Sequence, residues 1–243
     1  MLDMNDNYKI YCLSYNNPVR KLSMKNRFEK LNLNYIFYDG VNFTDPRIHY
    51  ESYKQCWSCM YGHLDMIKLF YDDPNINFGI FCEDDIFIHK DFCELIPKII
   101  QDFTYLNLDV LLLGYLLGFK IKKNNQNFIL KNNNLDSDKY NYLNFPNDLW
   151  GAQMYMLSKE NAGKILGKYD QNSNYAVKTL VDKSMTPFSA DWTITKDGNR
   201  ALLYPCIAVE NGDINITHYD GCYGQYNFHK ICHEINYDPN VFI

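Results

Sequence analysis

The sequence predicts an α/β fold, a single domain with a mostly parallel central sheet flanked by helices. The 243-residue chain is long enough for one domain with a sizeable core. Short apolar and aromatic runs alternate with longer segments whose apolar residues recur at helical spacing. With 47% hydrophobic and 22% charged residues, the composition is that of a globular protein.

Strand-like and helix-like segments alternate through the first half of the chain. Apolar and aromatic runs predict strands, whereas apolar residues at helical spacing, such as Trp57, Met60 and Leu64, predict helices. This alternation is typical of a parallel sheet, because each return between parallel strands needs a crossover connection, usually a helix. We expect strands at residues 8–15, 34–42, 78–88 and 109–116, and helices at 19–33, 52–73 and 90–103.

The second half of the chain is less regular. Residues 120–147 are polar and Asn-rich, which predicts an excursion containing a short hairpin with an exposed tip at 131–139. Order resumes with a strand at 151–158 and a helix at 159–169, and a Gly-rich tail follows at 217–228. Because no internal repeat is present, we interpret 1–243 as one domain, composed of a first half (1–119), the excursion (120–147) and a second half (148–243).

Charge and apolar patterning argue against a nucleic-acid partner and against a membrane-spanning segment. The formal charge of −5 argues against a nucleic acid, which needs a concentrated basic surface. The longest apolar stretch, residues 109–119, is too short to span a bilayer, and the amino terminus has no leader pattern, so we expect a cytoplasmic protein. The abundance of Asn, Tyr, Ile and Lys suggests an AT-rich genome, and a protein of viral origin would act in the host cell or the virion.

Three consecutive acids, Glu83, Asp84 and Asp85, interrupt the apolar segment GIFCEDDIFI at residues 79–88. In one extended strand Glu83 and Asp85 would share a face, about 6.5 to 7 Å apart, and Asp84 would point the other way. A bound divalent cation would supply the missing positive charge, at the carboxyl end of a parallel strand where ligands bind. The alternative is a solvated strand end that precedes a helix capped by Asp91.

Several motifs, taken in order, resemble glycosyltransferase family 25, which contains bacterial lipooligosaccharide galactosyltransferases and collagen hydroxylysine galactosyltransferases. Each motif is weak alone, but their order and spacing together are specific. Two positions depart from the family pattern: Gly62 stands where the family has Ser, and residues 13–15 (Leu-Ser-Tyr) stand where it has Asn-Leu-Asp. The matching segments are YCLSYNNPVRKLSM (11–24), FYDGVN (37–42), CMYGHLDMIK (59–68), GIFCEDDIFI (79–88), WGAQMYMLSKENAGKIL (150–166) and SADW (189–192).

This resemblance implies a GT-A (Rossmann-like) fold and inversion at the anomeric carbon. It also implies a UDP-sugar donor, carrying galactose or glucose, and a divalent cation that is usually manganese, with magnesium as the other option. The acceptor would be a hydroxyl of a glycan or of a hydroxylysine-containing protein. Residues 1–119 would form the nucleotide-binding half and 148–243 the acceptor-side half.

The resemblance also implies roles for particular residues. Asp85 is the expected principal metal ligand, with Glu83 or Asp84 on the metal or the ribose. His218 is the expected histidine that completes the metal shell, as opposed to a surface histidine beside a turn. Arg20 is expected to pair with the diphosphate, although a lone Arg after a strand is more often solvated. The other expected donor-binding residues are Leu13, Ser14, Tyr15, Asp39 and Gly151.

The acceptor hydroxyl needs a base, and Asp191 is our candidate, because its neighbour Trp192 could desolvate it and stack on a sugar. A helix-capping role for Asp191 is an equal alternative. Gly151 could let a sugar approach the backbone or could serve only a turn. We expect His63 to support helix packing.

Two other functional classes compete with a sugar-transferring enzyme. The departures at Gly62 and at residues 13–15 leave open a catalytically silent relative that binds a glycan or a protein. A metal-dependent phosphohydrolase is less favoured, because no second acidic cluster for a paired metal is evident. A zinc site on Cys56, Cys59, His229 and His233 is also disfavoured, since the second pair lies far downstream.

Overall fold

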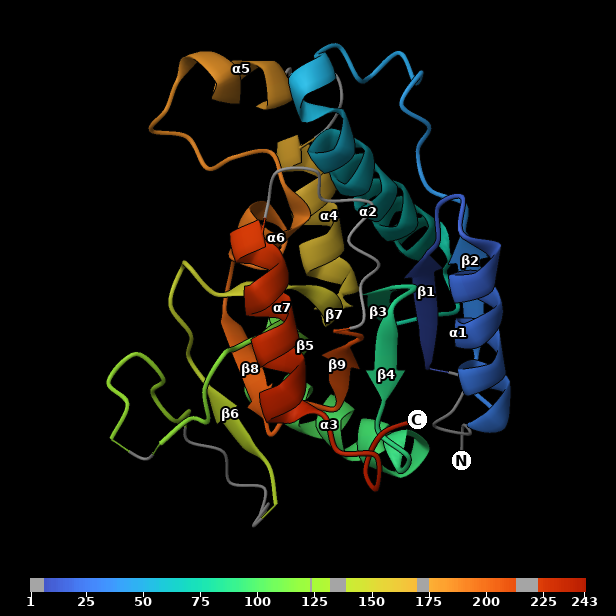
Figure 1. Cartoon of the computed structure of the whole chain (residues 1–243), viewed down its shortest axis with the longest axis vertical. Coiled ribbons are helices and arrows are strands. Elements are labelled where there is room, and N and C mark those ends of the chain that lie inside the picture. Colours follow the sequence, from blue (N-terminus) through green and yellow to red (C-terminus); the bar gives the residue numbers. More distant parts are fainter. Residues whose placement is uncertain (1–6, 123, 132–138, 170–174, 213–222) are drawn as a thin grey trace.

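A computed structural model describes residues 7–122, 124–131, 139–169, 175–212 and 223–243, with the side chains of 223–226 excepted. A nine-stranded sheet runs through the molecule with helices packed against it (Figure 1). The strands are β1 (Tyr8–Leu13), β2 (Tyr35–Tyr38), β3 (Phe78–Glu83), β4 (Ile86–Ile88), β5 (Val110–Leu116), β6 (Asn141–Leu143), β7 (Trp150–Ser158), β8 (Arg200–Tyr204) and β9 (Ala208–Glu210). The helices are α1 (Pro18–Lys30), α2 (Lys54–Asp72), α3 (Phe92–Tyr105), α4 (Lys159–Tyr169), α5 (Tyr175–Val181), α6 (Ala190–Thr193) and α7 (Tyr223–Asn236), with a 3-10 turn at Glu51–Tyr53.

The main path of the sheet has the order β2-β1-β3-β7-β5-β8-β6, and β4 and β9 pair beside it. Strands β1, β2, β3, β5 and β8 point the same way, whereas β7 and β6 run antiparallel to their neighbours. The predicted α/β class, with a mostly parallel central sheet flanked by helices, is therefore confirmed.

Alternate residues of each central strand enter one of two cores, as the two-residue period of a strand requires. Tyr11, Phe81 and Tyr155 face the core shared with α2, α4 and α6, and their rings stack across three adjacent strands with centroids 5.3 and 5.2 Å apart. Ile10 and Ile80 face the opposite core, which α1 and α3 cover. The sheet is thus buried on both faces.

The predicted single strand at 78–88 is wrong. Strand β3 ends at Glu83, residues 84 and 85 form a turn, and β4 begins at Ile86 (Figure 1). Strand β4 then leaves the main path and pairs antiparallel with β9, with Ile86 opposite Glu210. The acids therefore stand at a turn between two strands.

The second half of the chain contains a short hairpin and two helices that can be compared with the expectations from sequence. Residues 129–131 and 142–144 pair through backbone hydrogen bonds, as expected for a short hairpin, and its tip at 132–138 lies outside the described residues. The region expected to form a Gly-rich tail includes the start of helix α7, which lies beside β9 (Figure 1). Helix α5 was not predicted.

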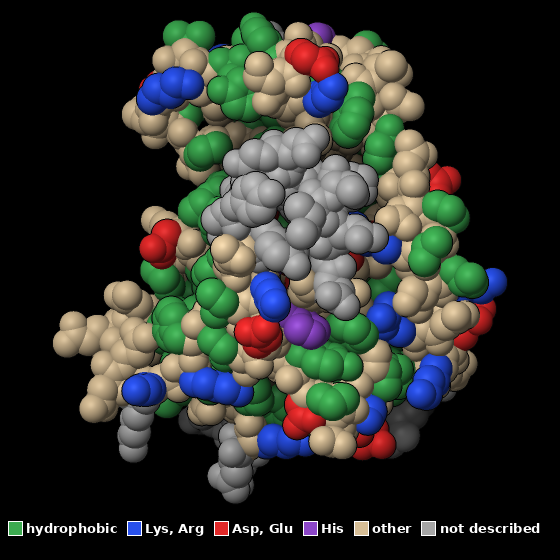
Figure 2. Space-filling view, in the orientation of Figure 1, with side chains coloured by type: hydrophobic (Ala, Val, Ile, Leu, Met, Phe, Trp, Pro, Cys, Tyr) green, Lys and Arg blue, Asp and Glu red, His purple; other side chains and the backbone are tan. Residues whose placement is uncertain are grey.

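On the face drawn in Figure 2, the described basic side chains are scattered among acidic and apolar ones. Among the residues that the structure describes, we find no helix with the length and apolar content to span a membrane.

Candidate active site

A cavity of about 670 Å³ opens beside the turn that follows β3. Acidic side chains from three separate parts of the fold line it, so we call it the acidic cavity. Its lining residues are Tyr15, Asn16, Asn17, Arg20, Phe43, Gln55, Cys56, Cys59, Glu83, Asp85, Trp150, Gln153, Ser189, Asp191, Trp192, Glu210 and His229.

Arg20 holds two of the three consecutive acids. Asn17 caps α1 by accepting a hydrogen bond from the Arg20 backbone amide, which places Arg20 in the first turn of the helix. Its Nε atom lies 2.9 Å from Asp84 Oδ1, and its guanidinium also contacts Asp85 Oδ2. The hydroxyl of Ser14 donates to Asp84 Oδ2 at 2.6 Å. Arg20, Asp84 and Asp85 are therefore paired rather than simply solvated, although Asp91 does occupy the N-cap position of α3, as the alternative for the acids expected.

Asp84 is thus a buried anchor of the turn, with 6% of its surface exposed. Burial raises the pKa of Asp84 above its ordinary value, and the charge of Arg20 opposes that shift. Both of its oxygens already have partners and Asp84 does not line the cavity, so its role is to hold the turn in place.

Asp85 faces the acidic cavity together with Glu210. The Asn211 backbone amide donates to the Asp85 carbonyl at 2.6 Å, which holds the turn against the end of β9. Burial, followed by the negative charge of Glu210, raises the pKa of Asp85 well above its usual range. Asp85 Oδ1 is buried and has no hydrogen-bond partner among the described residues. This oxygen is available to a ligand.

Glu210 is itself held by a histidine and an amide. His229 Nδ1 lies 2.7 Å from one of its oxygens, and Gln153 Nε2 donates to the other at 3.3 Å. Burial acts to lower the pKa of His229, but its hydrogen bond to Glu210 outweighs that effect and the net pKa is raised. Glu210, Gln153 and His229 form a polar wall opposite Arg20 that was not predicted as a unit.

Asp191 enters the acidic cavity from the first turn of α6. Its Oδ1 accepts hydrogen bonds from the backbone amides of Gly151 (3.1 Å) and Ala152 (2.9 Å). Burial raises the pKa of Asp191, and the charge of Glu83 raises it further. Ser189 occupies the position that caps α6, so the capping alternative for Asp191 is wrong.

Glu83 occupies the wall nearest α2. One of its oxygens lies 3.6 Å from His63 Nε2 and accepts a hydrogen bond from Cys59 at 3.6 Å. Burial acts to raise the pKa of Glu83, but His63 and Arg20 outweigh it and the pKa is lowered overall. His63 is fully buried beneath this wall, and its Nδ1 lies 2.9 Å from the Tyr155 hydroxyl.

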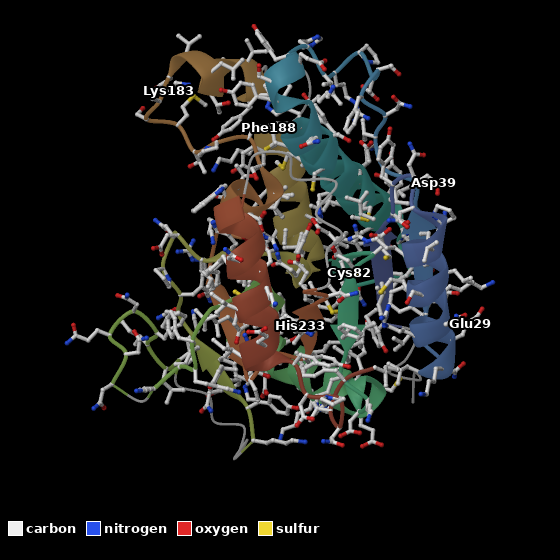
Figure 3. All side chains as sticks on the ribbon, in the orientation of Figure 1. Glu29, Asp39, Cys82, Lys183, Phe188 and His233 are labelled. Carbon is white, nitrogen blue, oxygen red and sulfur yellow. The ribbon has the colours of Figure 1, made fainter. Side chains whose placement is uncertain are left out.

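The remaining residues expected to bind the donor fall in different places. Tyr15 packs on Phe43 in the cavity wall, with ring centroids 5.6 Å apart, and Leu13 lines a smaller adjoining pocket of about 170 Å³. Asp39 lies at the outer edge of the molecule (Figure 3), where it is exposed and pairs with Lys21. His218 lies outside the described residues.

Gly151 has a packing reason to be glycine. A Cβ at this position would lie 2.5 Å from Leu112 Cδ1, inside the core. The absent side chain therefore makes room for Leu112, and the backbone amide is the part of Gly151 that serves the site.

Most of the sequence, residues 7–185, matches one family of known proteins. The family model described as glycosyltransferase family 25 (LPS biosynthesis protein) covers residues 7–185. The chain belongs to glycosyltransferase family 25. Its reaction is therefore the transfer of a sugar from a donor to an acceptor. The family 25 match includes the turn at 84–85 and Arg20, and it ends before Asp191, Glu210 and His229.

Two solved structures are similar to this family 25 member at low TM-score. A197 from STIV has a TM-score of 0.42 and 13% sequence identity, with 81% of each chain covered. A glycosyltransferase involved in the glycosylation of the major capsid of PBCV-1 has a TM-score of 0.37 and 10% identity, with 79% of this chain and 81% of that chain covered. No curated protein matches the sequence.

Proposed function

We propose that this family 25 glycosyltransferase moves galactose or glucose from a UDP-sugar to a hydroxyl of a glycan or of a hydroxylysine-containing protein. The proposed reaction inverts the anomeric carbon and uses a divalent cation, manganese or magnesium. One observation carries the proposal: the acidic cavity joins Asp85, Glu210 and Asp191, which come from separate elements, with Arg20 beside them.

The residues of the acidic cavity fit a hard divalent cation. Asp85 Oδ1 is a buried carboxylate oxygen without a partner among the described residues, and the Glu210 carboxylate faces the same space. Carboxylate oxygens are the donors that manganese and magnesium prefer. Asp85 and Glu210 would hold the ion, which when bound neutralises charge that develops on the diphosphate leaving group.

The wall formed by Tyr15, Phe43 and Arg20 suits the nucleotide. The Tyr15–Phe43 ring pair offers an aromatic surface to a base, and the Arg20 guanidinium lies next to the proposed cation position. The Gln153 side-chain oxygen is buried without a partner among the described residues and lines the same cavity, so it can accept from a sugar hydroxyl.

Asp191 is the proposed base for the acceptor hydroxyl. Two backbone amides fix the position of one carboxylate oxygen, Oδ1. A raised pKa makes the carboxylate a stronger base than an exposed Asp. The indoles of Trp150 and Trp192 line the cavity beside it, with centroids 6.2 Å apart, and provide apolar surface for an acceptor sugar.

The test is a panel of UDP-sugars incubated with the full chain and manganese, with released UDP and transferred sugar both measured. We expect turnover of UDP-galactose or UDP-glucose, loss of manganese-dependent UDP binding in Asp85→Asn, and loss of transfer with UDP binding retained in Asp191→Asn. Asp182→Asn is a matched control, because Asp182 is exposed and absent from the cavity wall. Unchanged UDP binding in Asp85→Asn, with no sugar consumed by the wild type, would contradict the proposal.

A catalytically silent module is the second candidate, because Gly62 and residues 13–15 depart from the family pattern, and two of these residues, Leu13 and Tyr15, line the pocket that adjoins the cavity. The same titration separates the two functions. A silent module would bind a glycan or a partner protein and show no manganese-dependent UDP binding, whereas the enzyme binds UDP only through its cation.

A further inference from the structure

Cys59, His63 and Glu83 bring three different metal-ligating atoms together beneath one wall of the acidic cavity. Cys59 and His63 are four residues apart on α2, so their side chains project from the same face of the helix. Glu83, the last residue of β3, meets them across the gap between helix and sheet. The Cys59 sulfur, His63 Nε2 and one Glu83 oxygen all lie within 4.8 Å of one another.

His63 provides a second, independent reason to place a ligand here. Its side chain is fully buried, and Nε2 has no hydrogen-bond partner among the described residues. The 3.6 Å separation from Glu83 is too long for a hydrogen bond between nitrogen and oxygen. A buried ring nitrogen without a partner carries a desolvation cost, and a cation would remove that cost.

Tyr155 fixes the direction in which His63 presents this nitrogen. Its hydroxyl lies 2.9 Å from His63 Nδ1, and both side chains are fully buried. When Nδ1–H donates to the Tyr155 oxygen, the lone pair is on Nε2 and points at Cys59 and Glu83. Metal-ligating histidines are commonly held in this way by an outer hydrogen bond.

We propose that Cys59, His63 and Glu83 form a site for a thiophilic divalent cation of the zinc class, with its remaining coordination position open to the acidic cavity. Sulfur, imidazole nitrogen and carboxylate oxygen are the donors that zinc uses, and three protein ligands with one open position are typical of accessible zinc sites. Both Cys59 and Glu83 line the cavity, which gives the ion a route of entry.

This site is separate from the proposed manganese position. Asp85 and Glu210 offer only oxygen donors, which suit manganese and magnesium, whereas a thiolate favours zinc. It is also not the set of Cys56, Cys59, His229 and His233 considered from sequence, because His229 and His233 bind Glu210. The inference does not depend on the sugar donor, so it stands or falls independently of the proposed function.

Equilibrium dialysis of the full chain against zinc, followed by metal analysis, is the first test. We expect one zinc per chain, and a cobalt-loaded sample should show a thiolate-to-cobalt charge-transfer band in the near ultraviolet. Cys59→Ser, a nearly isosteric change, should abolish that band. Tyr155→Phe, which keeps the buried ring, should weaken zinc binding roughly 10–100-fold, as expected for loss of an outer-shell partner.

Two matched controls make the outcome decisive. Cys56→Ser changes a neighbouring cavity thiol on the same helix and should leave zinc binding and the cobalt band unchanged. Asp85→Asn changes a different acidic residue of the cavity and should leave the zinc stoichiometry intact. Zinc bound at less than a tenth of an equivalent by the wild type, or a cobalt band that survives Cys59→Ser, would overturn the inference.

Discussion

The side chain of Leu13 occupies the space beside Gly62. A Cβ at position 62 would lie 2.7 Å from Leu13 Cδ1 and 3.2 Å from Cδ2. These are two of the positions at which the sequence departs from the family 25 pattern. The structure shows that they are in contact, so the larger residue at one position is accommodated by the smaller residue at the other.

Gly62→Ser should therefore destabilise the protein by about 1–3 kcal/mol, the usual cost of overpacking a core. The sign of the change in unfolding free energy is informative, because replacing a mid-helix glycine without a clash would instead stabilise the helix by up to about 1 kcal/mol. Urea unfolding of Gly62→Ser, Leu13→Asn and the double variant measures the coupling. We expect the double variant to be more stable than the sum of the single effects by about 0.5–3 kcal/mol, and simple additivity would contradict the contact.

Arg20→Met should destabilise the cation-free protein by roughly 1–3 kcal/mol, because it leaves the buried carboxylates of Asp84 and Asp85 without their positive partner. Urea unfolding in a chelator measures the change. Lys21→Met is the matched control, since its partner Asp39 is exposed and the loss should stay within about 0.5 kcal/mol. If Arg20→Met and Lys21→Met lowered the free energy of unfolding equally, Arg20 would not be the residue that compensates the buried charges of Asp84 and Asp85.

Transfer activity should rise with pH through a pKa above that of an ordinary Asp. A base acts only when it is deprotonated, and burial raises the pKa of Asp191, so the acidic limb of the kcat/KM profile is displaced to higher pH. Asp191→Glu should keep a displaced limb at reduced rate, whereas Asp191→Asn should abolish transfer. Full activity in Asp191→Asn would assign the base to another group.

Asp102 should make the folded protein less stable as pH rises through the mildly acidic range. Its carboxylate accepts from Tyr142, its second oxygen has no partner among the described residues, and burial raises its pKa. Because the folded state holds the proton more tightly than the unfolded state, stability falls as pH rises from the ordinary Asp pKa through the raised value. Asp102→Asn should remove this pH dependence. Urea unfolding at several pH values should show that the free energy of unfolding of the variant falls less with rising pH than that of the wild type.

The sequence predicts the layered architecture well, because local periodicity determines most of it. The helix expected at 159–169 coincides with α4, and strands β1, β5 and β7 lie within or next to their expected ranges. The direction of β7 was not predictable, since alternating apolar residues do not indicate which way a strand runs. The residues on both sides of the acids favour a strand, so the sequence predicts one continuous strand at 78–88. Contacts of Arg20 and Ser14 with Asp84, which are distant in sequence, stabilise a turn there instead.

The sequence predicts only part of the site, because only some of its residues belong to local motifs. Asp85, Arg20 and Asp191 belong to short motifs that could be recognised, and the structure brings all three to one cavity. Glu210 and His229 were not identified as partners of Asp85, because no local pattern surrounds them. The pairing of β4 with β9 and the packing of α7 beside β9 bring them near the turn.

The pairing of Ile86 with Glu210 has a consequence for how the cavity responds to ions. Glu210 belongs to this strand pair, and Asp85 directly precedes Ile86. The backbone hydrogen bonds between β4 and β9 therefore keep the two segments together despite the repulsion between the two carboxylates. The proposed cation would therefore meet carboxylates that are already oriented, and little rearrangement would accompany its binding. Under the proposed function, a substitution that loosens this strand pair should weaken cation binding even when every acidic residue is kept.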